Sequence, residues 1–383
     1  MAKKKELTKK AGERLLLELG SLPTAAGRED AVLALVRRWV SARPRLLLKR
    51  DPCGNLLVAR ADFEKACRRK APLLITAHMD HPAFGVKSVK GRSVRLDFLG
   101  GVQDAYFKGA AIEIFSRDLA RVCPARVLSL DAAAKPFKSV KAALARVAPY
   151  VGPGCIGRWR FPAARVSKGL AHLPACDDLA CLAAALLAYE KISADSSLAP
   201  AAPLFTRAEE VGFVGAIGAA RGGSIPEGAR LVCLECSRSF PHDSPIGAGP
   251  IVRVGDKMSV FTPELTNIIS DVAEAHKKAH PAFRYQRKLM AGGACEATGF
   301  ASYGLKSACL CLPLGNYHNM VDPDGVLAGR KKARVAPEFI SVADYRGLIE
   351  LLCAVARGLD APRPSARSSM EKIWSERAGV LKA

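Results

Sequence analysis

Five acidic or histidine residues in this chain follow apolar runs, at points where strands are expected to end. They are two histidines and three carboxylates: His78, Asp177, Glu210, Glu235 and His318. The carboxyl ends of strands in an open α/β sheet converge on one crevice, so we expect these side chains to meet there. Imidazole and carboxylate ligands in this mixture suit a pair of zinc, cobalt or manganese ions. Two such ions can share a water, lower its pKa and polarise a peptide carbonyl.

Two further acids stand where such a centre needs them. Asp80 lies two residues after His78, on the same face of the expected strand, and could orient that imidazole as a hydrogen-bond acceptor. Glu209 directly precedes Glu210 at the end of another apolar run. One member of this pair can bind metal while the other faces the water as a general base.

Other metal-like spacings have simpler explanations. Cys233 and Cys236 form a CxxC pair around Glu235, but no second CxxC follows and the run is apolar, which favours buried thiols. His276 and His280 lie four residues apart, as in a zincin helix. Lys277 stands where that mechanism needs a glutamate, so a solvated helix face is the better interpretation.

The elements that would position these groups follow from the apolar spacing. Residues 7–42 repeat apolar positions at helical intervals, with an interruption near residue 20. The run APLLITAH, at 71–78, is typical of a central strand in a mostly parallel sheet. From residue 171 onward, strand-like and helix-like segments alternate, which predicts a mixed, mostly parallel α/β sheet with helices on both faces.

Residues 82–170 differ from the rest, because apolar and polar residues alternate there around glycine turns. We interpret this segment as an inserted β-rich subdomain carrying a basic helix-like piece at about 134–147. The catalytic domain would then comprise residues 1–81 and 171–360. The tail, 361–383, has little pattern and is expected to be loosely ordered.

Composition limits the class of protein. The chain has 383 residues, of which 49% are hydrophobic, and a formal net charge of +22. Aromatic residues make up 6%, and no basic helix is interleaved with aromatics, so nucleic-acid binding is not expected. No apolar run approaches the roughly 20 residues of a membrane span. The 12 cysteines are scattered in apolar segments, as reduced thiols would be. We therefore predict a cytoplasmic protein without membrane contact.

Five sequence blocks resemble, in order, those of the M42 family of dinuclear metallo-aminopeptidases. They are AHMDHPAFGVKSV, RLDFLGG with FKGAAIEI, CDDLACLAAAL, RAEEVGFVGA and LPLGNYHNM. Any one of these blocks would be weak evidence, but five in the family's order are specific. The resemblance covers roughly residues 10–355.

The resemblance implies a phosphopeptidase-like α/β catalytic domain with a β-barrel-like insertion used in homo-oligomer contacts, acting on peptides with two divalent metal ions. Asp177 would bridge the metals, and the other four ligands would complete the two coordination shells. Glu209 would take a proton from the attacking water and pass it to the leaving amine, while Asp80 would orient His78. Relatives often have a cis peptide after the bridging aspartate, here Asp177–Asp178.

Departures from the family pattern lie close to these blocks. Glu235 stands where M42 aminopeptidases usually have aspartate, and some related carboxypeptidases use glutamate there. His81 begins a His-Pro-Ala segment in place of Glu-Ile-Gly, and Glu296 ends a Gly-Gly-Ala-Cys-Glu segment in place of Gly-Gly-Thr-Asp. The resemblance therefore makes His81 and Glu296 candidate substrate-binding residues. Leu179 occupies a position where arginine is usual.

Three functional hypotheses follow. The first is a metal-dependent aminopeptidase that removes N-terminal residues. The second keeps the site but acts as a carboxypeptidase or deacylase, with Glu235 as its main support. The third is a basic binding protein on a peptidase scaffold, suggested by the net charge. The native metal, the preferred residue and the number of subunits do not follow from the sequence, because pocket loops and metal availability decide them.

Overall fold

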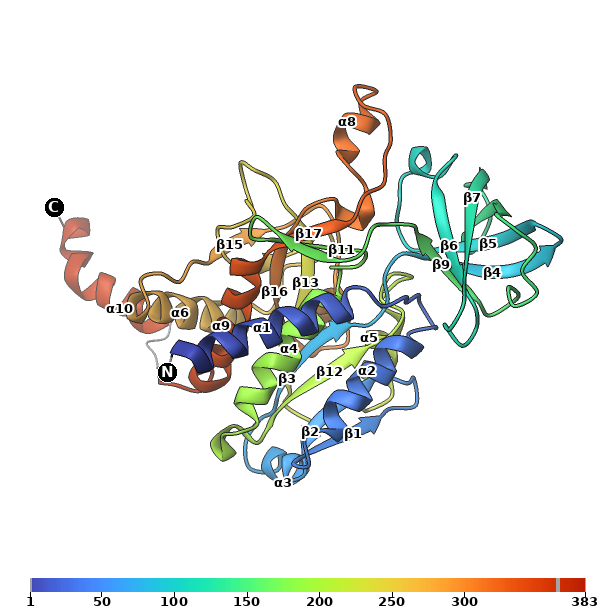
Figure 1. Ribbon diagram of the computed structural model, residues 1–383. Helices are drawn as coiled ribbons and strands as arrows, with labels where there is room; N and C mark the ends of the chain where they lie inside the picture. Colours follow the sequence, from blue (N-terminus) through green and yellow to red (C-terminus); the bar gives the residue numbers. More distant parts are fainter. Residues whose placement is uncertain (1, 363–365, 383) are drawn as a thin grey trace.

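The main body is a mixed eight-stranded sheet covered by helices on both faces (Figure 1). The computed structural model describes residues 2–362 and 366–382. In sheet order the strands are β1 (Leu46–Arg50), β2 (Leu56–Arg60), β12 (Ala201–Thr206), β3 (Leu73–His78), β13 (Arg230–Arg238), β16 (Lys306–Leu314), β14 (Ile251–Gly255) and β15 (Gln286–Leu289). The four central strands, β12 to β16, run parallel. All six residues of β3 are buried, as its unbroken apolar sequence predicts.

Alternate residues of the central strands point to two separate cores. On one face, Val232 and Leu234 of β13 pack under α1 (Ala2–Leu19), α2 (Asp30–Ser41), α4 (Leu179–Ile192), α6 (Pro263–Ala279) and α9 (Val342–Gly358). On the other, Leu231 and Cys233 face α3 (Phe63–Cys67), α5 (Val214–Arg221) and α7 (Glu296–Ser302). Successive strand residues point to opposite faces, so each strand contributes to both layers. The predicted α/β class, with helices on both faces, is confirmed.

A closed six-stranded barrel stands beside this body (Figure 1). Its strands are, in order around the barrel, β4 (Ala83–Lys90), β5 (Ser93–Leu99), β8 (Lys138–Leu144), β7 (Val122–Asp131), β6 (Ala111–Phe115) and β9 (Ile156–Trp159). The interior holds an aromatic cluster in which Phe84 meets Trp159 edge-on, with ring centroids 4.8 Å apart. Aromatic pairs in this geometry add to the stabilisation that burial supplies.

The helix-like piece expected at about 134–147 is wrong, because β8 occupies that stretch. Val140, Ala142 and Leu144 alternate into the barrel core, and strands β5 and β7 flank β8 on either side. The alanines and basic residues of this segment have good helix propensity. Tertiary pairing overrides a weak local preference of this kind.

The remaining elements connect or extend these two parts. A three-stranded sheet comprises β10 (Arg165–Ser167), β11 (Leu170–Leu173) and β17 (Glu338–Ser341), and the short helices are η1 (Asp104–Tyr106), η2 (Ser196–Leu198), η3 (Tyr317–Asn319) and α8 (Pro323–Leu327). At the end of the chain, α10 (Ala366–Arg377) and η4 (Ala378–Lys382) project from the body (Figure 1). Part of the predicted loose tail is therefore helical.

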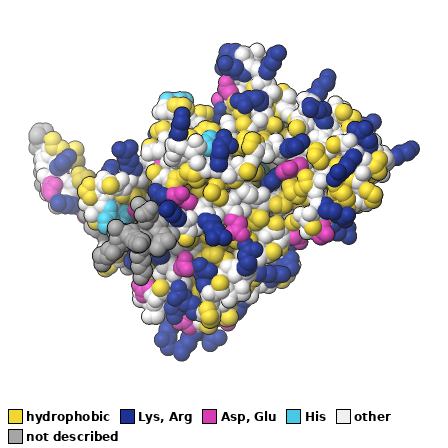
Figure 2. All heavy atoms as spheres, viewed as in Figure 1, with side chains coloured by type: hydrophobic (Ala, Val, Ile, Leu, Met, Phe, Trp, Pro, Cys, Tyr) yellow, Lys and Arg dark blue, Asp and Glu magenta, His cyan; other side chains and the backbone are white. Residues whose placement is uncertain are grey.

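Basic side chains are spread over the visible face in Figure 2, over the body and the barrel alike. Within the described residues, no helix is both long and apolar enough to cross a membrane.

Candidate metal centre

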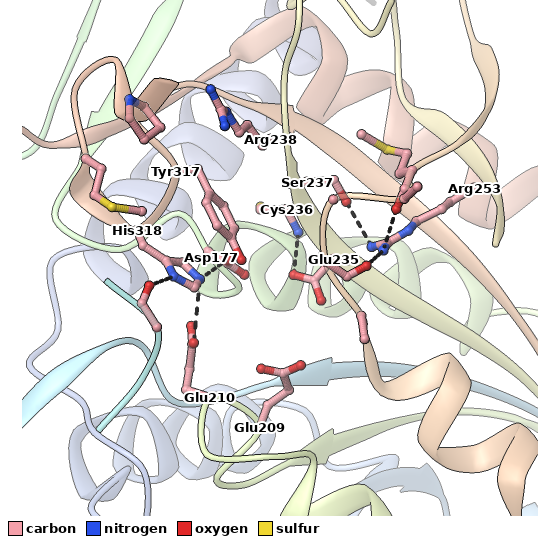
Figure 3. Close-up of a pocket in the computed structure, with 18 of the residues that line it drawn as sticks. Asp177, Glu209, Glu210, Glu235, Cys236, Ser237, Arg238, Arg253, Tyr317 and His318 are labelled. Atoms are coloured by element: carbon pink, nitrogen blue, oxygen red, sulfur yellow. Dashed lines mark hydrogen bonds and ion pairs between the residues drawn. The ribbon is translucent and has the colours of Figure 1, made fainter. Parts of the chain in front are cut away.

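The structure brings the five predicted ligands together at the carboxyl edge of the central strands. Figure 3 shows four of them: Asp177, Glu210, Glu235 and His318. His78 is the last residue of β3, and Glu235 lies near the end of β13. The other three ligands lie in connecting segments: Glu210 follows β12, Asp177 precedes α4, and His318 lies within η3 after β16. Parallel strands deliver their following loops to the same edge, which is why distant segments meet here.

The Asp177 carboxylate lies between the two imidazoles. Its Oδ1 is 3.3 Å from His78 Nε2, and its Oδ2 is 3.5 Å from His318 Nε2. Glu210 Oε2 lies 3.5 Å from His318 Nε2, and Glu235 Oε1 lies 3.9 Å from His78 Nε2. Each imidazole thus has one oxygen of Asp177 and at least one further carboxylate beside it. The bond between Asp177 and Asp178 is cis, as the resemblance implies.

Two ligand oxygen atoms of this centre, Asp177 Oδ1 and Glu210 Oε1, are buried and have no hydrogen-bond partner among the described residues. Donor atoms of His78, Asp177 and Glu210 all lie within 4.8 Å of one another, as do those of His78, Glu209 and Glu235. Buried polar atoms normally have partners, so unpartnered oxygens arranged around imidazoles fit divalent cations. The residue types and their spacing are compatible with two such ions.

Asp80 ties the first ligand to the acidic loop. Its Oδ1 lies 3.4 Å from His78 Nδ1, and its carboxylate accepts hydrogen bonds from the backbone N–H groups of Glu209 (2.9 Å) and Glu210 (3.1 Å). The 3.4 Å contact is an ion pair without hydrogen-bond geometry. A carboxylate on that side of the ring favours the other nitrogen, Nε2, as the one that faces a metal. Glu209 Oε2 lies 3.9 Å from His78 Nε2 and faces the pocket (Figure 3).

Burial and mutual repulsion shift the pKa values of the carboxylates at this centre. Burial raises the pKa values of Glu209 and Glu210 well above the usual range, and neighbouring carboxylates add to the effect. The pKa of His78 is also raised, since the acids around it outweigh the opposing effect of burial. Buried carboxylates this close together are stable only when protons or cations neutralise part of their negative charge.

Comparison with known proteins agrees with this arrangement. The sequence model of the M42 glutamyl aminopeptidase family matches residues 147–330. The predicted resemblance to the M42 family is confirmed over this segment. The matched segment contains four of the five predicted ligands, and His78 precedes it. No curated protein matches the chain.

Solved structures share the architecture over nearly the whole chain. A TET aminopeptidase from a marine-sediment Thaumarchaeota archaeon has a TM-score of 0.73 at 17% identity, covering 92% of this chain and 98% of its own. An aminopeptidase from Desulfurococcus kamchatkensis has a TM-score of 0.71 at 18%, covering 94% and 99%. The TET1 peptidase of Pyrococcus horikoshii has a TM-score of 0.69 at 17%, covering 90% and 99%. At these identities the matches establish a shared fold.

One buried acid of the candidate metal centre was missed from the sequence. Glu338, in β17, accepts hydrogen bonds from the backbone N–H groups of Cys176 (2.7 Å), Asp177 (3.0 Å) and His318 (2.8 Å). Burial, with the nearby Asp177, raises its pKa to about 8. Glu338 thereby joins two ligand-bearing segments from a separate sheet. No apolar strand runs into this residue, so it lacks the signal that marked the other acids.

His81 and Glu296, both predicted to contact substrate, do not line the pocket of the candidate metal centre. His81 is buried, with Nδ1 against the carbonyl of Asp177 and Nε2 3.1 Å from Asn319 Oδ1. Glu296 begins α7 on the far face of the sheet, where both of its oxygens are buried and burial raises its pKa to about 7. Both side chains are buried away from the lining of this pocket, and their assignment to substrate binding stays a prediction.

The pocket in front of the ligands has a volume of about 460 Å³. Two arginines that the sequence did not single out line it. Arg253 is buried and donates to Ser237 Oγ (3.2 Å) and to the carbonyl of Gly293 (2.6 Å), which fixes the 290–293 loop against β14. Arg238 stands beside Phe240 and pairs with Asp324 of α8 through two contacts, one of 3.0 Å.

Proposed function

We propose that this chain is a metal-dependent exopeptidase, an aminopeptidase that hydrolyses N-terminal residues from peptides. The observation that carries the proposal is the position of Asp177, with one oxygen toward His78 and the other toward His318. A carboxylate in that position suits the bridge between two cations. The M42 family match supports the same reaction class.

In this proposal His78, Asp177, Glu210, Glu235 and His318 hold two divalent cations, zinc, cobalt or manganese. When bound, such ions polarise a peptide carbonyl and lower the pKa of a water. Glu209 takes the proton from the attacking water at its carboxylate and gives it to the leaving amine. Asp80 keeps His78 oriented and, through two backbone hydrogen bonds, holds Glu209 in place.

Assembly belongs to the proposal as well. One related structure is described as a dodecamer, and the P. horikoshii peptidase as a tetrahedron or a large octahedral shell. We infer that this chain also forms a homo-oligomer. The barrel within the proposed insertion, 82–170, would supply contacts between subunits.

A panel of end-blocked peptides tests the reaction. Purified protein, loaded with zinc, cobalt or manganese, should cleave short peptides and aminoacyl nitroanilides that have a free N-terminus. A chelator should abolish turnover, and re-addition of metal should restore it. Cleavage that tolerates a blocked N-terminus but requires a free C-terminal carboxylate would overturn the aminopeptidase assignment.

A carboxypeptidase or deacylase remains the second candidate, because the pocket walls carry guanidinium groups. Arg238 and Arg253 line the same pocket as the acids. Arginine binds carboxylates in a planar, two-pronged geometry, which suits a substrate's free C-terminus. The same peptide panel separates this candidate from the first.

A further inference from the structure

A second cluster of metal-binding side chains lies directly beneath the candidate centre. Asp178 immediately precedes α4, Cys181 lies in the first turn of that helix, and Cys236 follows Glu235 on β13. All three are at most 1% exposed. Their ligand atoms lie within 4.8 Å of one another. None of these three residues has a role in the proposed hydrolysis.

Asp178 is the unexplained member of this cluster. Both of its carboxylate oxygens are buried, and neither accepts a hydrogen bond of ordinary geometry from any described residue. Within the described part of the chain, no lysine or arginine forms an ion pair with it. A buried carboxylate without a partner is costly, so the position calls for a proton or a cation.

The two sulfur atoms have the spacing that a tetrahedral metal requires. Cys181 Sγ and Cys236 Sγ are 3.7 Å apart. Zinc–sulfur bonds of about 2.3 Å at the tetrahedral angle place two thiolates about 3.8 Å apart. Two thiolates and a carboxylate are also ligands that zinc accepts together. The second oxygen of Asp178 offers a fourth donor.

We propose that Asp178, Cys181 and Cys236 bind a further thiophilic divalent cation, such as zinc, distinct from the pair at the pocket. This ion would join the start of α4 to the end of β13. Asp178 is adjacent in sequence to Asp177, and Cys236 is adjacent to Glu235. The buried ion would therefore hold the segments that carry two of the proposed catalytic ligands.

Binding replaces two thiol protons. The structure gives each thiol a carbonyl acceptor: Cys181 Sγ lies 3.3 Å from the oxygen of Glu235, and Cys236 Sγ lies 3.4 Å from that of Cys176. A divalent ion would displace both thiol protons to solvent, together with any proton on the Asp178 carboxyl, and leave a site with a formal charge of −1. Neutral thiols donating to those carbonyls are the competing state, and the experiment below distinguishes the two.

Cobalt substitution tests the site in the full-length protein. The metals are removed anaerobically, and Co²⁺ is titrated back while absorbance and bound metal are measured. Thiolate ligands give an intense sulfur-to-cobalt charge-transfer band, whereas imidazole and carboxylate ligands do not. We expect that band together with three bound cobalt ions per chain. Two ions or fewer without the band would overturn the proposal.

The double variant Cys181→Ala/Cys236→Ala should lose the band and one cobalt ion while retaining the other two. The matched control, Cys123→Ala/Cys353→Ala, removes two buried thiols outside the cluster and should retain both signals. A band that persists in the first variant would assign it to other cysteines and contradict the site. If the double variant does not fold, the wild-type spectrum decides alone. If the proposed two-metal centre in the pocket does not form, fewer than three cobalt ions would bind while the charge-transfer band remains.

Discussion

Glu209 and Glu210 are neighbours in the chain, yet their side chains have different partners. Glu210 lies against His318, whereas Glu209 faces the pocket near His78. We predict that Glu209→Gln lowers kcat by about 10²–10⁴-fold, the range of general acid–base catalysis. Glutamine has nearly the same shape but cannot accept the proton. Bound metal, measured by mass spectrometry of the elements, should stay at the wild-type level.

A suitable control for that substitution is Glu264→Gln. Glu264 lies on α6, and its side chain is 74% exposed. Its activity and metal content should match wild type. A carboxylate oxygen of Glu209 also lies within 4.8 Å of possible ligand atoms of His78 and Glu235. Loss of one metal ion in Glu209→Gln would therefore show that Glu209 is a ligand and contradict its assignment as the base.

Glu338 is predicted to support the centre without touching substrate. The Glu338 carboxylate now accepts hydrogen bonds from three backbone N–H groups. In Glu338→Gln the amide NH₂ would face at least one of these donors. Leaving such a donor unpaired costs about 1–3 kcal/mol. We expect a lower Tm and metal affinity weaker by about 10–100-fold, measured by competition with a chelator. Unchanged metal affinity would limit Glu338 to a role in stability.

The proposed ligands could be located from sequence because each follows or precedes an apolar strand or helix, and the α/β rule brings such positions together. Glu338 could not, since it reaches the centre from a short strand in a separate sheet. Glu296 could not be placed either, because helix α7 turns it to the far face of the sheet. Sequence order shows that a residue is near a strand end, but not which way a following helix carries it.

Between His318 and Glu338 the chain leaves the body as an arm, 319–337, that carries α8 and projects beside the barrel (Figure 1). Met320 packs into the barrel core, and the carbonyl of Val321 accepts from Tyr106. Met320 and Pro323 line the pocket. The arm therefore connects barrel, pocket and body, and its position should affect substrate binding more than folding.

Asp324→Ala tests that expectation by removing the carboxylate that pairs with Arg238. The two side chains are 59% and 29% exposed, so the pair contributes about 0–1 kcal/mol to stability. We predict little change in Tm, faster tryptic cleavage at Arg330–Arg334, and a KM raised about fivefold, equivalent to about 1 kcal/mol. Asp97→Ala, which removes a barrel ion pair with Lys87, should change neither the cleavage rate nor KM. Equal effects in both variants would show that the arm does not contribute to substrate binding.

The barrel shows where sequence patterns fail at the level of elements. Alternation in 82–130 predicts strands correctly, because each strand buries one face and exposes the other. The stretch 134–147 carries the same alternation within alanines and lysines that also suit a helix. Only the neighbours β5 and β7, brought in by barrel closure, decide between the two.

For the molecule as a whole, the acids at the centre link folding to metal and to pH. Burial, with repulsion from Asp177, raises the pKa of Glu235 to about 7 in the absence of metal, against an ordinary value of 4.5. A raised carboxyl pKa means that the folded chain holds a proton that the unfolded chain releases. Its stabilising contribution is complete below about pH 4.5 and is lost as the pH rises through about 7.

The metal-free protein should therefore lose stability between about pH 5 and 7.5, while the loaded protein should not, because cations there replace the proton. Metal at 100 times its Kd adds about 2.7 kcal/mol, so the difference in Tm between the two forms should widen as the pH rises. Thermal melts of chelator-treated and zinc-loaded protein across that range measure it, and Glu235→Gln should flatten the metal-free curve. Parallel curves for the two forms would mean that cations and protons do not compete for these carboxylates, against the assignment of Glu235 as a ligand.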